Sequence, residues 1–225
     1  MKRFTVQEAV QALDGVYTGA EAGLLRMVTN VTTDSRTVCE GSIFIALRGA
    51  RSDGHDFIAK ALDAGAVLCV GERAPKDAGE TPYVQVDSSL AAVGRLAAWY
   101  RGLFDIPVIG VTGSVGKTTT KEMIWSVLSQ VYRTHKTQKN FNNELGVPQT
   151  LLAMAQDAQA AVVEMGISDF GEMTRLTHMV RPTIAVMSII GYSHLEALSD
   201  RAGVLRAKSE IFAGMDAGAV AVVNG

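Results

Sequence analysis

Residues 106–123, IPVIGVTGSVGKTTTKEM, carry the side chains best suited to binding a phosphate group. Glycines let backbone N–H groups turn toward an anion, and a helix that begins there adds partial positive charge. Lys117 supplies a cation, and the Thr118 hydroxyl can reach a magnesium ion. The common motif G-x-x-x-x-G-K-[ST] has its first glycine where this chain has Val111, between Gly110 and Gly113. Because a strand pattern precedes the loop and a helix pattern follows it, we expect phosphate binding rather than an ordinary turn.

A magnesium nucleotide needs a second metal ligand, which in phosphate-loop proteins is a carboxylate at the end of a neighbouring buried strand. Glu164 in AAVVEMG follows three apolar residues and precedes Gly166, so it suits that place. A charge in a buried segment must be paired or bound to metal. We therefore expect Glu164 to bind metal; the alternative is a carboxylate at the strand end that points to solvent.

His194 and Lys208 are weaker candidates on spacing alone. His194 follows the apolar run VMSII and should lie at the same carboxyl edge of the sheet, where open α/β folds bind ligands. It suits a second metal or a phosphate contact, although a single histidine is more often structural. Helical spacing puts Lys208 and Glu210 on a solvated face. His135 and His178 have no comparable position, and we expect both in solvent.

Two polar loops near the N-terminus, TTDSR and ALRGARSDGHDF, concentrate donors, cations and carboxylates. Such side chains suit a diphosphate and the hydroxyls of a sugar or base, but they also suit plain polar turns, and composition leaves both open. The candidates are Asp34, Ser35, Arg36, Arg48, Asp53 and His55.

Alternating helix and strand patterns must position these side chains. Residues 31–104 predict a small α/β unit with strands at 42–47, 66–70 and 83–86, and with helices at 55–65 and 89–104. Phe57, Ile58, Ala61 and Leu62 should line the first helix, and Leu90, Val93, Leu96 and Tyr100 the second. Before them, Thr5 and Glu8 form a capping-box pattern that opens an amphipathic helix.

From residue 105 onward the pattern predicts a parallel, doubly wound α/β sheet. Strands are expected at 106–111, 132–136, 160–165, 183–190 and 219–223. Helices are expected from the glycine turn to about Val131, near 147–155, and within 171–180 and 202–215. The first of these helices should bury one apolar face made by Met123, Ile124, Val127, Leu128 and Val131. Since Asn224 and Gly225 are turn formers, we expect a fragment of a longer protein.

Composition excludes several classes of protein. Of the 225 residues, 48% are hydrophobic and 20% charged, with a net charge of -2, so disorder and nucleic-acid binding are not expected. Two cysteines without metal-ligand spacing favour neither a disulfide framework nor a zinc site. With neither a leader pattern nor an apolar run long enough to span a bilayer, the sequence predicts a cytoplasmic protein without membrane contact.

Taken together, the motifs resemble the Mur ligase family, the ATP-dependent amide-bond ligases of peptidoglycan synthesis. The family's phosphate loop reads T-G-x-x-G-K-T, which TGSVGKTT from Thr112 matches, so the displaced glycine is a family variant. Other matching stretches are DSR, ALRG with DGHDFI, KNFNNELGVPQTLL, VVEMGISDFGEMTRLT, RPTIAV and AKSEIF. NFNNELGVPQTLL and EMGISDFGE are most similar to members that add D-alanyl-D-alanine to UDP-N-acetylmuramoyl-tripeptide.

The resemblance implies a role for each candidate. ATP would phosphorylate the carboxylate of the UDP-sugar peptide, and the amine of the dipeptide would attack the acyl phosphate. Lys117 would stabilise the transferred phosphoryl group, Thr118 and Glu164 would hold the first Mg²⁺, and His194 with a carbamylated Lys208 would hold a second. The resemblance assigns Ser35, Arg36, Arg48, Asp53, His55, Asn142 and Asn143 to the substrate, and Thr112, Gly113, Ser114, Gly116, Lys117, Thr118 and Thr119 to ATP.

The same resemblance implies the domain organisation. Residues 1–104 would form a UDP-sugar-binding domain, and 105–225 an incomplete ATP-binding domain without the family's C-terminal domain. Such a chain should be monomeric and catalytically silent alone. Alternatives are a family member that adds the third, diamino residue or adds glutamate to folate, and a non-catalytic UDP-sugar- or nucleotide-binding protein. A phosphate-loop kinase or GTPase would leave the N-terminal unit unexplained.

Overall fold

The computed structural model describes residues 1–49, 52–73 and 81–224, so Gly225 lies outside the described residues. The chain divides into two compact units, Met1–Leu96 and Ala97–Gly225. Helix α3 (Ser89–Gly102) contributes to both units. Arg95, in its first half, donates to the Leu13 carbonyl of the first unit, and Arg101, in its second half, donates to the Val180 carbonyl of the second.

The first unit is built on a five-stranded sheet in the order β2-β7-β6-β5-β4, with β2 antiparallel at one edge and the other strands parallel. The strands are β2 (Val16–Thr18), β4 (Asn30–Thr32), β5 (Ser42–Ile45), β6 (Ala66–Gly71) and β7 (Tyr83–Gln85). A short antiparallel pair, β1 (Phe4–Thr5) and β3 (Met27–Val28), accompanies it. Strands β5, β6 and β7 confirm the three strands that the sequence predicts in this unit.

Helices of the first unit begin where the sequence indicated. Thr5 and Glu8 form the capping box that opens α1 (Val6–Leu13), as predicted. The other helical segments are the 3-10 turns η1 (Glu21–Leu25), η2 (Ser35–Thr37) and η3 (Gly54–Phe57), and the helix α2 (Ile58–Asp63). Ile58 of α2 packs on the core with Phe44, Cys69 and Tyr83, while Phe57 is exposed, contrary to expectation.

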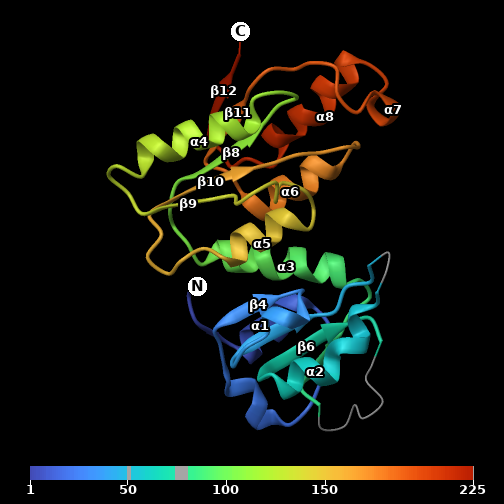
Figure 1. The fold of residues 1–225 in the computed structure, drawn as a ribbon. Coiled ribbons are helices and arrows are strands. Elements are labelled where there is room, and N and C mark those ends of the chain that lie inside the picture. Colours follow the sequence, from blue (N-terminus) through green and yellow to red (C-terminus); the bar gives the residue numbers. More distant parts are fainter. Residues whose placement is uncertain (50–51, 74–80, 225) are drawn as a thin grey trace. The chain divides into compact units, whose positions relative to one another are not determined.

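The second unit is an all-parallel sheet in the order β12-β11-β8-β10-β9. Its strands are β8 (Val108–Thr112), β9 (Thr134–Lys136), β10 (Ala160–Glu164), β11 (Ile184–Met187) and β12 (Val220–Val223). Its helices are α4 (Lys117–Leu128), α5 (Gly146–Leu152), α6 (Glu172–Val180), α7 (Leu195–Leu198) and α8 (Arg201–Ala213). In Figure 1, α4 lies on one side of the sheet and α5 and α6 on the other, which confirms the doubly wound prediction.

The strand order places the site. Strand β8 lies in the middle, and the chain moves from it toward β9 and β10 on one side and later toward β11 and β12 on the other. The register sets Glu164 beside Val111 and Met187 beside Thr112, so three strand ends meet at the carboxyl edge. A crevice at such a reversal of strand order is where open α/β folds bind ligands.

Helix α4 does not bury the apolar face that its sequence predicts. Met123, Val127 and Val131 are exposed, the last to 75%, and of the five predicted residues Ile124 and Leu128 pack against the sheet, together with Trp125. The one side chain of α4 that is buried is Lys121, with 1% of its surface exposed. The phosphate loop fixes the rotation of the helix, because Lys117, Thr118 and Lys121, three or four residues apart, share the face from which Thr118 and Lys121 contact Glu164.

The uncovered side of the second unit contains an apolar groove of about 920 Å³. Ile124 and Leu128 of α4 line one part of it, and side chains of β8, β11 and β12 line another. Strand β12 is exposed along its whole length. Since parallel sheets normally have both faces covered, this half of the sheet is unusual in facing solvent.

Two further expectations need correction. His135 is not in solvent: its Nε2 lies 2.8 Å from the Thr150 carbonyl oxygen, and burial lowers its pKa. Leu90 is exposed, so the buried stripe of α3 consists of Val93, Leu96 and Tyr100. His178 is exposed as predicted. No helix within the described parts of the chain is both long and apolar enough to cross a bilayer.

Candidate nucleotide and metal site

The loop between β8 and α4 has the conformation that its glycines predict. Gly113 has φ 145° and Gly116 has φ 83°, both in the region that side chains rarely adopt. A Cβ atom at Gly113 would also collide with the Ser188 hydroxyl. Gly116 is the N-cap of α4, so the chain turns there and presents the first N–H groups of the helix. These groups and the helix dipole form an anion site.

Contacts with the segment after β11 hold this loop in place. The Ser114 N–H donates to the Ile189 carbonyl at 2.8 Å, and the Ser188 hydroxyl donates to the Val115 carbonyl at 2.7 Å. The Lys117 ammonium donates to the Gly113 carbonyl at 2.8 Å. The cation therefore lies over the loop in which a phosphate would be bound.

Glu164, at the end of β10, is buried beside this loop with 2% of its surface exposed. Its Oε2 accepts from the Thr118 hydroxyl at 3.0 Å, and its Oε1 accepts from the Asn142 amide at 2.8 Å. Lys121 Nζ lies 3.6 Å from Oε2. The carboxylate is thus directed at the phosphate loop, and the alternative of a solvent-facing glutamate is wrong.

Lys208 of α8 is buried, with 1% of its surface exposed, so the solvated face that its spacing predicts is wrong. Burial, and secondarily the charge of Lys117, lower the pKa of Lys208 to about 8. Within the described residues, the Lys208 ammonium donates no hydrogen bond. Burial also lowers the pKa of Lys117, and Glu164 partly offsets that effect. Both amines therefore belong to one desolvated site.

His194 lies in the segment between β11 and α7 and adopts φ 54°. Its carbonyl accepts from the N–H of Leu198 at 2.9 Å, which fixes the first turn of α7. The residue lines a separate cavity of about 520 Å³ with Ser168 and Glu196. Across the described residues, no three His, Cys, Asp or Glu side chains converge as a metal-binding group. His194 and Glu164 are therefore not brought into one such group.

The two asparagines of the KNFNNELG segment differ in their contacts. Asn142 holds the Glu164 carboxylate, and its carbonyl accepts from the Gly166 N–H at 2.7 Å. Asn143 Oδ1 accepts from the N–H groups of Leu145 and Gly146 and so fixes the start of α5. Asn142 is the one that contacts the candidate metal ligand.

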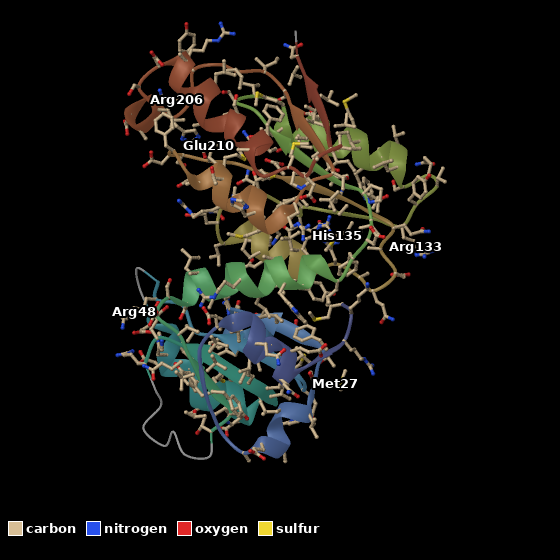
Figure 2. All side chains as sticks on the ribbon, turned by 180° about the vertical axis from the view of Figure 1, so that it is seen from behind. Met27, Arg48, Arg133, His135, Arg206 and Glu210 are labelled. Carbon is tan, nitrogen blue, oxygen red and sulfur yellow. The ribbon has the colours of Figure 1, made fainter. Side chains whose placement is uncertain are left out.

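Sequence reasoning missed two side chains of this region. Lys121 contacts Glu164, although nothing in its spacing distinguishes it from a surface lysine. Glu210, labelled in Figure 2, is not on a solvated face: its carboxylate accepts from the backbone N–H groups of Gly171 and Thr174 at the start of α6. Arg206 of the same helix lies 4.6 Å from the ring centroid of Phe170. No local sequence pattern links Glu210 to α6, because the N–H groups that it accepts from lie 39 and 36 residues away along the chain.

In the first unit, the second predicted loop forms a charged cluster. Arg48 and Asp53 pair across an isolated bridge, and Asp53 also accepts from the N–H of His55 and from Arg73. Arg48 Nε lies 3.6 Å from Glu72 Oε2. Glu72 and Arg73 were not predicted; they follow β6, at the edge where β5 also ends. Arg48 is half exposed and directed by two carboxylates, as a ligand-binding cation would be.

The first predicted loop is separate from that cluster. Asp34 accepts from the backbone N–H of Arg36 and from its guanidinium, which lowers the pKa of Asp34 to about 2. Ser35 begins the turn that this pair closes. Within the described residues, no hydrogen bond or ion pair joins these residues to Arg48, Asp53 or His55.

The residues around Glu164 fit a magnesium nucleotide. Mg²⁺ takes oxygen ligands, usually one or two carboxylates together with phosphate oxygens and water. Glu164 Oε2 and Thr118 Oγ1 supply a carboxylate and a hydroxyl oxygen 3.0 Å apart, next to the phosphate loop. His194 and Lys208, the predicted ligands of a second ion, do not form a comparable site. Lys208 carries an ammonium group, which cannot coordinate a metal ion.

Comparisons with known proteins agree with this geometry. Residues 111–225 match the model of the Mur ligase middle domain, and residues 27–101 match that of the Mur ligase family, catalytic domain. The UDP-N-acetylmuramoyl-tripeptide--D-alanyl-D-alanine ligase of Synechocystis sp. is 43% identical over 198 residues, which are 88% of this chain and 44% of that protein.

Two solved structures extend the likeness to the fold. Crystal structure I of MurF from Acinetobacter baumannii superposes with a TM-score of 0.90 at 36% identity, covering 99% of this chain and 49% of that one. The MurF ligase from Thermotoga maritima in complex with ADP has a TM-score of 0.81 at 35% identity, covering 87% and 45%. This chain spans less than half the length of each of these relatives. With the family's phosphate loop, its middle-domain sheet and its sequence over both units, the chain belongs to the Mur ligase family.

Proposed function

We propose that this chain forms the UDP-sugar domain (residues 1–104) and part of the ATP domain (residues 105–225) of a cytoplasmic ligase. That ligase joins D-alanyl-D-alanine to UDP-N-acetylmuramoyl-tripeptide, in peptidoglycan precursor synthesis, at the cost of ATP. The names and identities of the relatives support this choice of reaction. Because the chain spans less than half of those relatives, the complete reaction is proposed for a longer protein that contains it, and the 225 residues alone should not turn over.

The observation that supports the proposal best is the contact between Thr118 and Glu164. A buried carboxylate 3.0 Å from the hydroxyl that follows the loop lysine is the arrangement that a magnesium nucleotide requires. A buried carboxylate must be paired or bound to metal, so its position beside the loop hydroxyl favours a metal ligand. The ADP complex of the Thermotoga maritima relative is consistent with a nucleotide at this loop.

The reaction passes through an acyl phosphate. The substrate carboxylate attacks the γ-phosphorus of ATP, and ADP leaves. The amine of D-alanyl-D-alanine then adds to the acyl carbon, loses a proton, and expels inorganic phosphate as the amide bond forms. Lys117 neutralises charge on the transferred phosphoryl group, and the N–H groups of the loop orient it. When bound, Mg²⁺ at Thr118 and Glu164 would neutralise the phosphate oxygens.

Lys208 belongs to this proposal through its amine. A pKa of about 8 leaves part of the amine neutral near pH 7.5, and only the neutral amine reacts with CO₂. The resulting carbamate would replace a cation by an anion, which could hold a second metal together with His194.

For the UDP-sugar, the support lies in the charged loops of the first unit. Arg48 is held by Asp53 and Glu72 yet keeps more than half of its side chain exposed, so it can donate to a diphosphate. His55, Ser35 and Arg36 would add polar contacts. Asn142 and Asn143 are proposed to lie near the sugar and the ATP phosphates.

Calorimetric titration of the 225-residue chain with Mg²⁺·ADP tests the nucleotide site. Lys117→Ala should weaken binding at least tenfold, since one charge-assisted contact contributes about 1.5–3 kcal/mol. Lys60→Ala, an exposed lysine on α2, is the control and should bind normally. Equal affinity of the Lys117→Ala chain and the wild type would mean that the loop does not bind phosphate.

Titration with UDP-N-acetylmuramoyl-tripeptide tests the first unit. Arg48→Ala should reduce the affinity, whereas Arg133→Ala, which removes an exposed arginine of the second unit (Figure 2), should not. A folded wild-type chain that releases no heat with this ligand would refute a UDP-sugar site.

An assay of turnover tests which reaction of the Mur ligase family this protein catalyses. The sequence, extended to the length of its relatives, is assayed for phosphate release with D-alanyl-D-alanine and with single amino acids, including diamino acids. Release with the dipeptide alone is expected. Release with a diamino acid but not the dipeptide would reassign the enzyme to the preceding step.

A further inference from the structure

Lys121 is the one residue of α4 that is buried, although it carries a charge and neighbouring apolar residues of the helix do not take its place. It follows Thr118 by three residues and Lys117 by four, so all three share one helix face. That face is turned toward β10. A lysine in such a position needs a compensating charge, because an unpaired buried ammonium is expensive.

The compensating charge is on Glu164. Lys121 Nζ lies 3.6 Å from Glu164 Oε2 and donates to the Thr137 carbonyl at 3.0 Å, and both side chains of the ion pair are only 2% exposed. Thr137 also joins the pair from its other side, since its hydroxyl accepts from the Glu164 N–H at 2.9 Å. A second carboxylate, Glu122, lies 3.2 Å from Nζ but is nearly half exposed. The buried partner of Lys121 is therefore the proposed metal ligand.

Oε2 is the oxygen that both Lys121 and the Thr118 hydroxyl contact. We propose that Lys121 is a positioning residue that neutralises Glu164 when no metal is bound and shares Oε2 with the metal when one binds. This inference rests on the proposed magnesium nucleotide function. It assigns to Lys121 a role in setting metal affinity: the ammonium keeps the carboxylate in place, and it also opposes a second cation at the same oxygen.

The metal-free protein tests the ion pair by itself. Lys121→Met keeps the length of the side chain and removes its charge, so its thermal unfolding midpoint should fall by several degrees. Adding Glu164→Gln to that variant should restore most of the loss, because the uncompensated charge is then gone. If the two changes lower the midpoint additively, the pair does not exist.

Metal binding tests the other part of the proposal, which is that Lys121 lowers the affinity for the metal ion. Wild-type and Lys121→Met chains are titrated with ADP in EDTA and with ADP at rising Mg²⁺, and unfolding is followed by tryptophan fluorescence. We expect Mg²⁺ to raise the midpoint more in Lys121→Met than in the wild type, with an apparent Kd for Mg²⁺ about tenfold lower. An equal or smaller response in Lys121→Met would overturn the proposal.

Lys136→Met is the matched control. Lys136 pairs with the same Glu122 and lies over the Trp125 ring, but its ion pair within the described residues does not involve Glu164. Its Mg²⁺ response should equal that of the wild type. If Lys121→Met does not fold, Lys121→Gln, which keeps a donor for the Thr137 carbonyl, replaces it under the same criteria.

Failure of the inference is distinguishable from failure of the proposed function. If Mg²⁺·ADP does not stabilise the wild-type chain, both the nucleotide function and the metal role of Lys121 are refuted. The metal-free double variant still decides whether the pair is present. A normal wild-type response without enhancement in Lys121→Met leaves the function standing and removes only this role.

Discussion

Lys208→Met should stabilise the chain, although the substitution removes a proposed catalytic residue. Burial in the second unit lowers the pKa of this lysine from 10.5 to about 8. At about 1.4 kcal/mol for each tenfold change in the proton equilibrium, holding the charged amine in place costs about 3 kcal/mol. Methionine has a similar length and carries no charge, so it keeps the packing and removes most of that cost.

The stabilisation by Lys208→Met should depend on pH, whereas an effect of packing alone would not. Below pH 8 the amine is protonated in both the folded and the unfolded chain, and the full cost is present. Between pH 8 and 10.5 the folded chain loses the proton first, the unfolded chain binds more protons, and the stability of the wild type rises with pH. The advantage of Lys208→Met should therefore be largest at pH 7 and should shrink toward pH 10.

Urea unfolding at pH 7 and pH 9.5, without metal or nucleotide, measures both quantities. The free energy of unfolding of Lys208→Met should exceed that of the wild type by about 2–3 kcal/mol at pH 7. Lys60→Met, at an exposed position, controls for loss of charge alone. A Lys208→Met chain that is less stable than the wild type at pH 7, or a difference that does not change with pH, would refute the reasoning.

Three other substitutions test the fold around the site. Gly113→Ala should abolish Mg²⁺·ADP binding in calorimetry, because the new Cβ atom meets the Ser188 hydroxyl at a φ of 145°; retained binding would mean that the loop tolerates another conformation. Glu210→Gln should lower the free energy of unfolding by about 1–2 kcal/mol in urea, since the charge at the N-terminus of α6 is lost, and no change would show that the contact is not formed. Tyr100→Phe should cost about 1 kcal/mol, because the hydroxyl donates to the Met154 carbonyl inside the core; an equally stable variant would exclude that bond.

Strands and their order of appearance could be predicted from the sequence, because buried parallel strands are nearly continuous apolar runs. AVLCV became β6 and AAVVE became β10, with Glu164 at the strand end as expected. Gly113 and Gly116 were also predictable, since few positions tolerate a positive φ without glycine. These features depend on the residue types within one short segment of the chain, so the sequence alone can predict them.

The inward faces of the helices could not be predicted in the same way. Apolar periodicity assigned Met123 and Val127 to the buried face of α4, and polarity assigned Lys208 to the surface of α8. Both assignments are wrong because the contacts of the site, rather than the burial of apolar side chains, set which face of each helix is buried. These faces carry Lys121 in α4 and Lys208 in α8. Resemblance to a family identified Lys208, and only the geometry identified Lys121.

The apolar groove on the open side of the second sheet limits how the unfolding experiments can be read. Dyes that fluoresce on apolar surface would bind the folded chain there, and the signal would be high before any unfolding begins. Trp125 of α4, one of two tryptophans in the chain, packs against the same sheet and donates to the Thr134 carbonyl at 3.0 Å. The part of the intrinsic emission that comes from Trp125, as distinct from Trp99, reports the loss of α4, which carries Lys117, Thr118 and Lys121.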